Sequence, residues 1–201
     1  MRILIPYTPH DPKSRLEPIL SPSERHSFAR AMLADVVETV TATGHTPHIL
    51  ADADVPDPPA PVTVDDRSLS TAVNAALEPP MAIAMADLPL MTPAILAGAI
   101  DQPADVVIGP GRGGGTNLLV VRSESFSVDY HGMSLSDHRQ IARRADLHIE
   151  ELDSYRVSVD IDEPADLVEV LLHGHGRSLS WLQSHGFEPV ATDGRVDIRR
   201  R

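Results

Sequence analysis

The sequence predicts an α/β protein, a three-layer α/β/α sandwich with a mixed, mainly parallel sheet. Short apolar runs alternate with segments of helical periodicity, and helices of this length between strands imply parallel neighbours and helices on both faces. A glycine-rich stretch at residues 109–115 then leads directly into another apolar run, which breaks the alternation. The 201 residues, 42% of them hydrophobic, suffice for one sizeable core and show no break in composition. We therefore expect a single domain over residues 1–201.

The elements of the first half follow from caps and periodicity. Residues 2–6 are typical of a short buried strand, and residues 7–16 have turn-forming residues without periodicity, which indicates a loop. Ser21-Pro-Ser-Glu24 is a capping box, and the apolar stripe behind it runs to Gly44, which predicts a long helix. The next expected elements are a strand around 48–50, a loop over 52–61, a helix over 70–77, a strand over 81–86, a helix over 92–100 and a strand over 105–108.

The second half continues with the same two periodicities. An extended apolar run follows the glycines, and the last helical segment ends at Gly186. The expected elements are an extended run over 118–121, a helix over 134–144, strands over 147–152 and 155–159, a helix over 163–172 and a helical segment over 178–185.

The charge balance is strongly acidic, with 17 basic against 29 acidic residues and a formal net charge of -12. Lys13 is the only lysine of the chain. Such a surface repels a phosphate backbone, so we expect no nucleic-acid partner. An acidic, lysine-poor composition also resembles proteins of salt-loving organisms, and we expect such an organism as the source; an ordinary acidic protein is the alternative.

The chain offers no thiolate chemistry and no membrane segment. It has no cysteine, which excludes disulfides and thiolate metal ligands. The apolar start at residues 1–6 is too short for a signal peptide, and no run approaches the roughly 20 residues of a membrane span. We therefore expect a soluble protein in the cytoplasm.

Aspartates follow two of the predicted strands. Asp87 comes after the run 81–86, and Asp160 and Asp162 close the run 155–159. Ligands of open α/β sheets bind at the carboxyl ends of the strands, so these carboxylates predict a site for a hard cation such as Mg²⁺, which brings a phosphate. The alternative is that Asp87 and Asp162 only cap the helices that follow.

Lys13 and Arg15 lie in the loop after the first strand, where α/β proteins place phosphate contacts. We interpret them as candidate triphosphate ligands that neutralise charge in phosphoryl transfer. Two solvated surface cations are the alternative. The chain has no Gly-x-x-x-x-Gly-Lys-Ser/Thr motif, which excludes an ordinary P-loop kinase or ATPase.

A second group of candidates follows the glycines. The stretch 109–117 is not a dinucleotide fingerprint, because it leads into an extended run and not a helix. Its glycines let a backbone approach an anion, with Thr116 and Asn117 as side-chain donors; a flexible hairpin turn is the alternative. Ser134 begins a helix, where an anion is favoured, and His138 lies one turn later, although Ser134 also suits an N-cap.

Together these motifs resemble the archaeal 2-phospho-L-lactate guanylyltransferase family, and the matches run across most of the chain. The residues that carry the resemblance are Ile5-Pro6, Pro12-Lys-Ser-Arg-Leu16, the helix from Glu24 to Val36, Asn74-Ala-Ala-Leu77, Ala86-Asp-Leu-Pro-Leu90, Gly113-Gly-Gly-Thr-Asn117, Tyr130, Ser134, His138 and Asp160-Ile-Asp162-Glu-Pro-Ala-Asp-Leu167. The resemblance implies a nucleotide-diphospho-sugar transferase-like sheet and the joining of GTP to 2-phospho-L-lactate in coenzyme F-420 biosynthesis, with Mg²⁺ and release of pyrophosphate.

The resemblance also implies roles for individual residues. It makes Lys13 and Arg15 triphosphate contacts, Asp87 and Asp162 metal ligands with Asp160 as a weaker one, and Thr116 and Ser134 holders of the acceptor phosphate. Asn74 is expected to read the guanine or the ribose. The chain departs from related nucleotidyltransferases in its first loop, which has prolines where they have glycines, and His131 stands where the family has a glycine.

Two other functions fit parts of this pattern. A molybdopterin or sugar-phosphate nucleotidyltransferase keeps the fold but usually begins with the glycine-rich loop that is missing here. A non-catalytic nucleotide-binding regulator has no need for paired metal carboxylates. A homodimer is expected from the resemblance, with its interface at the apolar hairpin after Gly115.

Overall fold

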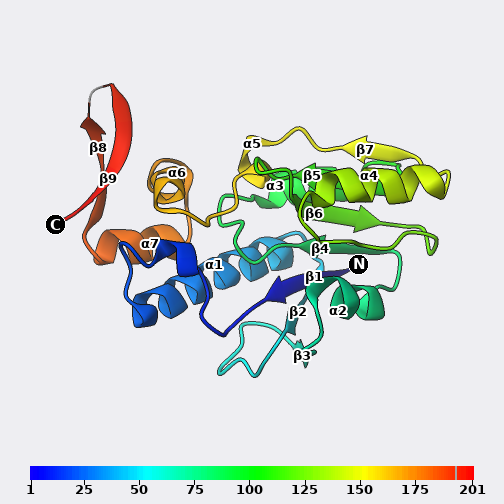
Figure 1. Ribbon diagram of the computed structural model, residues 1–201, viewed down its shortest axis with the longest axis horizontal. Coiled ribbons are helices and arrows are strands. Elements are labelled where there is room, and N and C mark those ends of the chain that lie inside the picture. The colour runs from blue at the N-terminus through cyan, green and yellow to red at the C-terminus, as the bar shows by residue number, and fades with distance from the viewer. Residues whose placement is uncertain (193) are drawn as a thin grey trace.

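A mixed, mostly parallel sheet organises the computed structural model, which describes residues 1–192 and 194–201 (Figure 1). Its seven strands follow the order β3-β2-β1-β4-β6-β5-β7. Strand β6 runs antiparallel to both β4 and β5, whereas the other neighbours are parallel, so the fold class expected from the sequence is confirmed. The strands are β1 (Arg2–Tyr7), β2 (Thr46–Ala51), β3 (Val62–Val64), β4 (Met81–Ala84), β5 (Val106–Pro110), β6 (Thr116–Val121) and β7 (Ile149–Glu151).

The long first helix begins at the cap that the sequence predicts. The Ser21 hydroxyl accepts a hydrogen bond from the Glu24 amide, and the Glu24 carboxylate accepts one from the Ser21 amide, which confirms the capping box. The helices are α1 (Pro22–Ala42), α2 (Leu69–Ala76), α3 (Pro93–Ile100), α4 (Ser134–Arg144), α5 (Tyr155–Ser158), α6 (Leu167–His173) and α7 (Arg177–Ser184), with short 3-10 turns η1 (Ser14–Leu16) and η2 (Pro164–Asp166).

Helices cover both faces of the sheet and complete the three layers. One core joins α1, α3 and α5 to one face, with Ile3 and Val120 of the strands buried against Val36 of α1. The other core joins α2 and α4 to the opposite face through Leu4 and Leu119. The alternation of inward and outward side chains along each strand thus divides the apolar residues between two cores.

A third apolar cluster lies beyond the sheet, where the C-terminal elements pack on the start of α1. Leu16 and Phe28 meet Leu182 of α7 and Phe187 of β8 in it. Strands β8 (Phe187–Thr192) and β9 (Arg195–Arg200) form an antiparallel hairpin that projects from this end of the molecule (Figure 1). We did not predict this hairpin from the sequence.

The strand expected over residues 155–159 is wrong, because the chain forms one turn of helix there, α5. Val157 belongs to the first core, and its Cγ1 lies only 2.7 Å from where a Cβ on Gly109 would stand. The alternating valines suggested a strand, but close packing of this turn against β5 outweighs their β-propensity. Asp160 and Asp162 therefore follow a helical turn and not a strand.

Two further expectations are corrected. Strand β3 pairs with β2 directly after the proline-rich loop, where we predicted no strand. The hairpin after Gly115 is no free surface, since all six residues of β6 are buried and β6 pairs on both sides. It cannot offer the interface of the expected homodimer, which itself stays a prediction.

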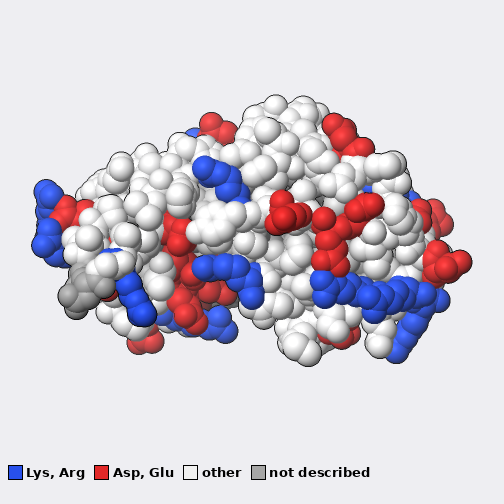
Figure 2. Space-filling model, turned by 90° about the horizontal axis from the view of Figure 1, so that it is seen from above, with Lys and Arg blue, Asp and Glu red and all other residues white. Residues whose placement is uncertain are grey.

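Charged groups of both signs share the surface. On the face in Figure 2, basic side chains lie beside acidic ones. Arg139 pairs with Glu151, and Arg199 pairs with Glu188, so these guanidinium groups already have carboxylate partners. Throughout the described residues, no helix combines the length and apolar character that a bilayer crossing demands. The cytoplasmic location stays an expectation.

A buried carboxylate of α1 caps the N-terminus of α7. Asp35 accepts hydrogen bonds from the amides of Arg177 (2.5 Å) and Ser178 (2.9 Å) and from the Ser178 hydroxyl. Asp35 is buried among apolar residues of α1. A Cβ on Gly176 would stand only 2.3 Å from Asp35 Oδ1, so only glycine fits beside this carboxylate. A side chain from a distant helix thus satisfies the free N–H groups of α7.

We expect Asp35→Ala to lower the free energy of unfolding by about 2 to 3 kcal/mol, because it leaves buried N–H groups without an acceptor. Glu38→Ala on the exposed side of the same helix is the matched control and should change it little. Urea unfolding of both variants, followed by circular dichroism, measures the difference. Equal stabilities of the two variants would contradict the capping role.

Candidate active site

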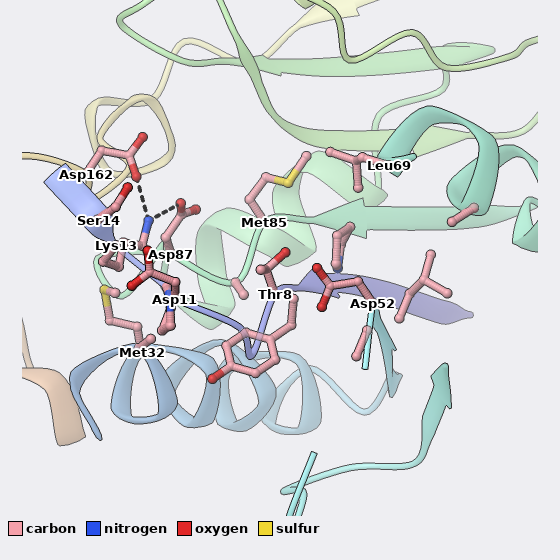
Figure 3. Close-up of a pocket in the computed structure, with 18 of the residues that line it drawn as sticks. Thr8, Asp11, Lys13, Ser14, Met32, Asp52, Leu69, Met85, Asp87 and Asp162 are labelled. Atoms are coloured by element: carbon pink, nitrogen blue, oxygen red, sulfur yellow. Dashed lines mark hydrogen bonds and ion pairs between the residues drawn. The ribbon is translucent and has the colours of Figure 1, made fainter. Parts of the chain in front are cut away.

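A cavity of about 460 Å³ opens at the carboxyl ends of β1, β2 and β4 (Figure 3). Strand β1 lies between β2 and β4, so the order of the strands reverses at this point. In open α/β sheets such a reversal leaves a crevice in which ligands bind. Lys13, Arg15, Asp87 and Asp162, four of the residues predicted from the sequence, line this cavity.

Lys13 connects two aspartates that lie far apart in the sequence. Its Nζ donates hydrogen bonds to Asp87 Oδ2 (2.6 Å) and Asp162 Oδ1 (2.7 Å), and only 12% of its side chain is exposed. Burial alone would lower the pKa of Lys13, but attraction by the two carboxylates outweighs it and the pKa is raised. Lys13 is therefore a largely buried ammonium ion. Arg15 lies further out, 69% exposed, with Nη1 3.5 Å from Asp162 Oδ2.

The loop that carries Lys13 is fixed by a buried arginine of α1. Arg25 Nη1 donates to Asp11 Oδ1 (2.7 Å) and to the Pro12 carbonyl (3.0 Å), and Arg25 is 5% exposed. Asp11 and Lys13 both have positive φ, 39° and 56°, in a loop without glycine. Arg25 thus stabilises a backbone conformation that glycine adopts more readily than aspartate or lysine. We missed it from the sequence, although an arginine inside the apolar stripe of a helix was a usable signal.

Three carboxylates gather beside Lys13. Asp87, Asp160 and Asp162 each offer an oxygen, and these oxygens lie within 4.8 Å of one another. The Ile161 amide donates to the Asp87 carbonyl (3.2 Å), which joins the two segments. Burial first, and then the negative charge of Asp87, raises the pKa of Asp160.

This cluster suits a hard dication, because it consists of carboxylates and one of their oxygens has no hydrogen-bond partner among the described residues. Its ligand atoms are all carboxylate oxygens, which Mg²⁺ prefers. Asp87 Oδ1 is buried and accepts no hydrogen bond from any described residue. The ammonium of Lys13 balances only part of the negative charge of the three carboxylates. The charge that remains favours the binding of a cation.

Asn117 lies behind the carboxylates and not among the cavity residues. Its Nδ2 donates to the Val157 carbonyl (2.8 Å) and to Asp160 Oδ1 (3.2 Å). A Cβ on Gly111 would stand 2.7 Å from Asn117 Oδ1, so the glycine-rich segment leaves space for this amide. Asn117 therefore orients Asp160.

Thr116, Ser134 and His138 form a separate group on the other side of β6. His138 is fully buried; its Nε2 accepts from the Asp129 amide (3.0 Å), so Nδ1 carries the proton and donates to Thr116 Oγ1 (2.9 Å). Ser134 is the first residue of α4, and the N-cap is Met133, which corrects the expected serine cap. None of the three lines the cavity of Lys13.

Asn74 does not line the cavity of Lys13. Its Nδ2 donates to the Val128 carbonyl and its Oδ1 accepts from the Val128 amide, both at 2.8 Å. Both ends of the amide are therefore used to attach α2 to the segment around Val128. The expected role of Asn74 in binding guanine or ribose is not supported by its position.

Burial of His138 makes stability depend on pH. Desolvation lowers the pKa of His138 from 6.5 to about 4, although the carboxylates of Asp129 and Asp137 oppose this. Between these values the unfolded chain binds a proton that the folded protein does not, so we expect stability to fall by about 3 kcal/mol as pH drops from 6.5 toward 4. His138→Gln should flatten this part of the profile in urea unfolding, and His26→Gln, at an exposed position, should not. An unchanged slope in His138→Gln would refute the assignment.

The chain is similar in sequence to known proteins over its whole length. The family model described as guanylyl transferase CofC like matches residues 1–201. The 2-phospho-L-lactate guanylyltransferase of Natronomonas pharaonis is 50% identical over 204 residues and covers 100% of both chains. That of Haloferax volcanii is also 50% identical over 204 residues, 100% of this chain and 98% of the other.

The fold has solved counterparts. A putative nucleotide-diphospho-sugar transferase from Desulfovibrio desulfuricans superposes with a TM-score of 0.75 at 18% identity, over 92% of this chain and 94% of that one. Its similarity concerns the fold alone, whereas the family model and the relatives extend over the whole chain. The chain therefore belongs to the guanylyl transferase CofC-like family, which its sequence motifs had indicated.

Proposed function

We propose that the protein joins GTP and 2-phospho-L-lactate to give lactyl-2-diphospho-5′-guanosine and pyrophosphate, a step of coenzyme F-420 biosynthesis. The relatives named 2-phospho-L-lactate guanylyltransferase support this choice of substrates. The observation that carries it is the position of Lys13 between Asp87 and Asp162 in the cavity. This arrangement offers both a cation for phosphates and oxygens for a metal ion.

The reaction requires positioning and charge neutralisation from the protein. A phosphate oxygen of the acceptor forms a bond to the α-phosphorus of GTP, and the bond from this phosphorus to the bridging oxygen of the β-phosphate breaks. Pyrophosphate leaves with the electron pair. No covalent nucleophile is needed, so Lys13 and Arg15 act by stabilising the negative charge of the triphosphate and of the leaving pyrophosphate.

Asp87 and Asp162, with Asp160 as a third ligand, would hold Mg²⁺ through their carboxylate oxygens. When bound, Mg²⁺ supplies Lewis-acid polarisation of phosphate oxygens and orients the donor. Asn117 fixes Asp160 for this purpose. The molybdopterin and sugar-phosphate alternatives lose support because the family match covers the whole chain.

As the resemblance implies, we place the acceptor phosphate at the start of α4, although Ser134 and Thr116 do not line the cavity of Lys13. The Leu135 amide donates to the Gly114 carbonyl (3.1 Å), so Ser134 lies beside the glycine-rich segment that leads to Thr116. A helix N-terminus favours a phosphate, which supports Ser134 as a phosphate ligand, although only 4% of this residue is exposed. Phosphoenolpyruvate and phosphoglycerate carry the same phosphate and are the competing acceptors.

We expect Asp87→Asn to lower pyrophosphate release from GTP and phospholactate at least about a hundredfold, because it removes a charged ligand next to the reacting phosphate. Asp153→Asn, at an exposed position outside the cavity, is the matched control. A coupled pyrophosphate assay with Mg²⁺ in high salt measures both. Turnover that survives Asp87→Asn would show that the metal assignment is wrong.

Removal of the Lys13 ammonium should increase the affinity of the carboxylates for a cation. We expect Lys13→Ala to bind Mn²⁺ about tenfold more tightly than the wild type without nucleotide, because the carboxylates lose their internal counter-ion. Lys13→Arg keeps the charge and should show no such gain. Electron paramagnetic resonance of free Mn²⁺ gives the affinities. Equal Mn²⁺ binding by wild type and Lys13→Ala would refute the shared site.

A further inference from the structure

The cavity has a second polar end, at Asp52, which the reaction described above does not use. Asp52 directly follows β2, whose last residue is Ala51, and its carboxylate points into the cavity toward Thr8 (Figure 3). Its Oδ1 is buried and has no hydrogen-bond partner among the residues that the structure describes. A buried carboxylate oxygen without a donor is costly, and a ligand that brings donors removes this cost.

Apolar side chains lie across the cavity from this carboxylate. Leu69 and Met85 line the same end, and Leu69 is 40% exposed although it is a large hydrophobic residue (Figure 3). Ala72 of α2 also lines the cavity here. A flat heterocycle would bury these apolar surfaces with its face and present its polar edge to Asp52.

The distance between the Asp52 end and the Asp87 end of the cavity matches the length of one nucleotide. Strands β2 and β4 flank β1, so Asp52 and Asp87 follow strands that are about 10 Å apart at the usual strand spacing. This separation is comparable to the span of a nucleoside from base edge to first phosphate. With the phosphates at Lys13 and Asp87, the base falls at Asp52.

We propose that Asp52 is the specificity-determining residue that reads the guanine base of the donor, an inference that rests on the proposed function. A carboxylate only accepts hydrogen bonds, and guanine has two adjacent donors, N1–H and the 2-amino group, that match its two oxygens. Adenine and cytosine place a ring-nitrogen acceptor beside their amino group, and uracil flanks its N–H with carbonyls. Each would set an acceptor against the carboxylate and leave it unsatisfied.

A carboxylate at the end of a strand also suits the hydroxyl groups of a ribose, which is the competing interpretation of Asp52. The two interpretations differ in their response to changes in the nucleotide. Base reading depends on the 2-amino group, which inosine lacks and xanthine replaces by a carbonyl. Ribose binding depends on the 2′-hydroxyl and is indifferent to the base.

The test compares wild type, Asp52→Asn and the exposed control Asp54→Asn with GTP, ITP, XTP, ATP and 2′-deoxy-GTP. Pyrophosphate release gives kcat/KM, and calorimetry with Mg²⁺ gives nucleotide affinity without the acceptor. For the wild type and the control we expect ITP and ATP to be at least about tenfold poorer than GTP. In Asp52→Asn, GTP should lose at least about tenfold and XTP should become better than GTP, because the amide accepts from N1–H and donates to the xanthine carbonyl.

Asp52→Ala separates lost recognition from lost folding: it should fold, keep the wild-type Mn²⁺ affinity and no longer distinguish GTP from ITP. The inference is overturned if Asp52→Asn keeps the wild-type order of nucleotides, or if wild type discriminates against 2′-deoxy-GTP and Asp52→Asn does not. Absence of pyrophosphate release from every nucleotide, with GTP still bound in preference to ITP, would instead refute the proposed reaction and leave the reading of guanine supported.

Discussion

The contact of Lys13 with Asp87 and Asp162 is the interaction on which the site depends. It draws together the first loop, the segment after β4 and the segment before α6, which are distant along the chain. Three carboxylates within 4.8 Å would repel one another strongly in a partly buried place, and the ammonium offsets this repulsion. The same arrangement fixes where an anionic ligand and its cation are able to bind.

The parts of the fold that the sequence predicted were those set by local signals. The capping box at Ser21 and the stripe behind it define α1, and the apolar runs define the central strands. The segment after Ser154 was mistaken for a strand because its conformation depends on packing against Gly109. The local sequence does not predict such a contact. Hairpin β8–β9 depends in the same way on the third cluster.

The residues of the site show the same distinction between those that local signals predict and those that depend on tertiary contacts. Lys13 and Asp87 were found because strand ends meet at one edge of a sheet, and Asp162 was found although its strand was not real. Arg25, Asp35 and Asp52 were missed, because a polar residue reveals its role only when its burial and its partners are known. Asn74 was assigned to the nucleotide by resemblance alone, and the hydrogen bonds to Val128 show how a motif residue serves the scaffold instead.

The balance of charge in the cavity limits how a nucleotide binds there. One ammonium faces three carboxylates, so the site without ligands repels a bare triphosphate. A nucleotide that carries its own dication would be attracted to the carboxylates, because Asp87 Oδ1 is buried and has no hydrogen-bond donor among the described residues. Binding of the dication to Asp87 and Asp162 would release Lys13 from part of its contact with them, so that its ammonium could turn toward phosphate oxygens. A single lysine thus suits both conditions, since its flexible stem and compact charge let it exchange partners, which a planar guanidinium does less readily.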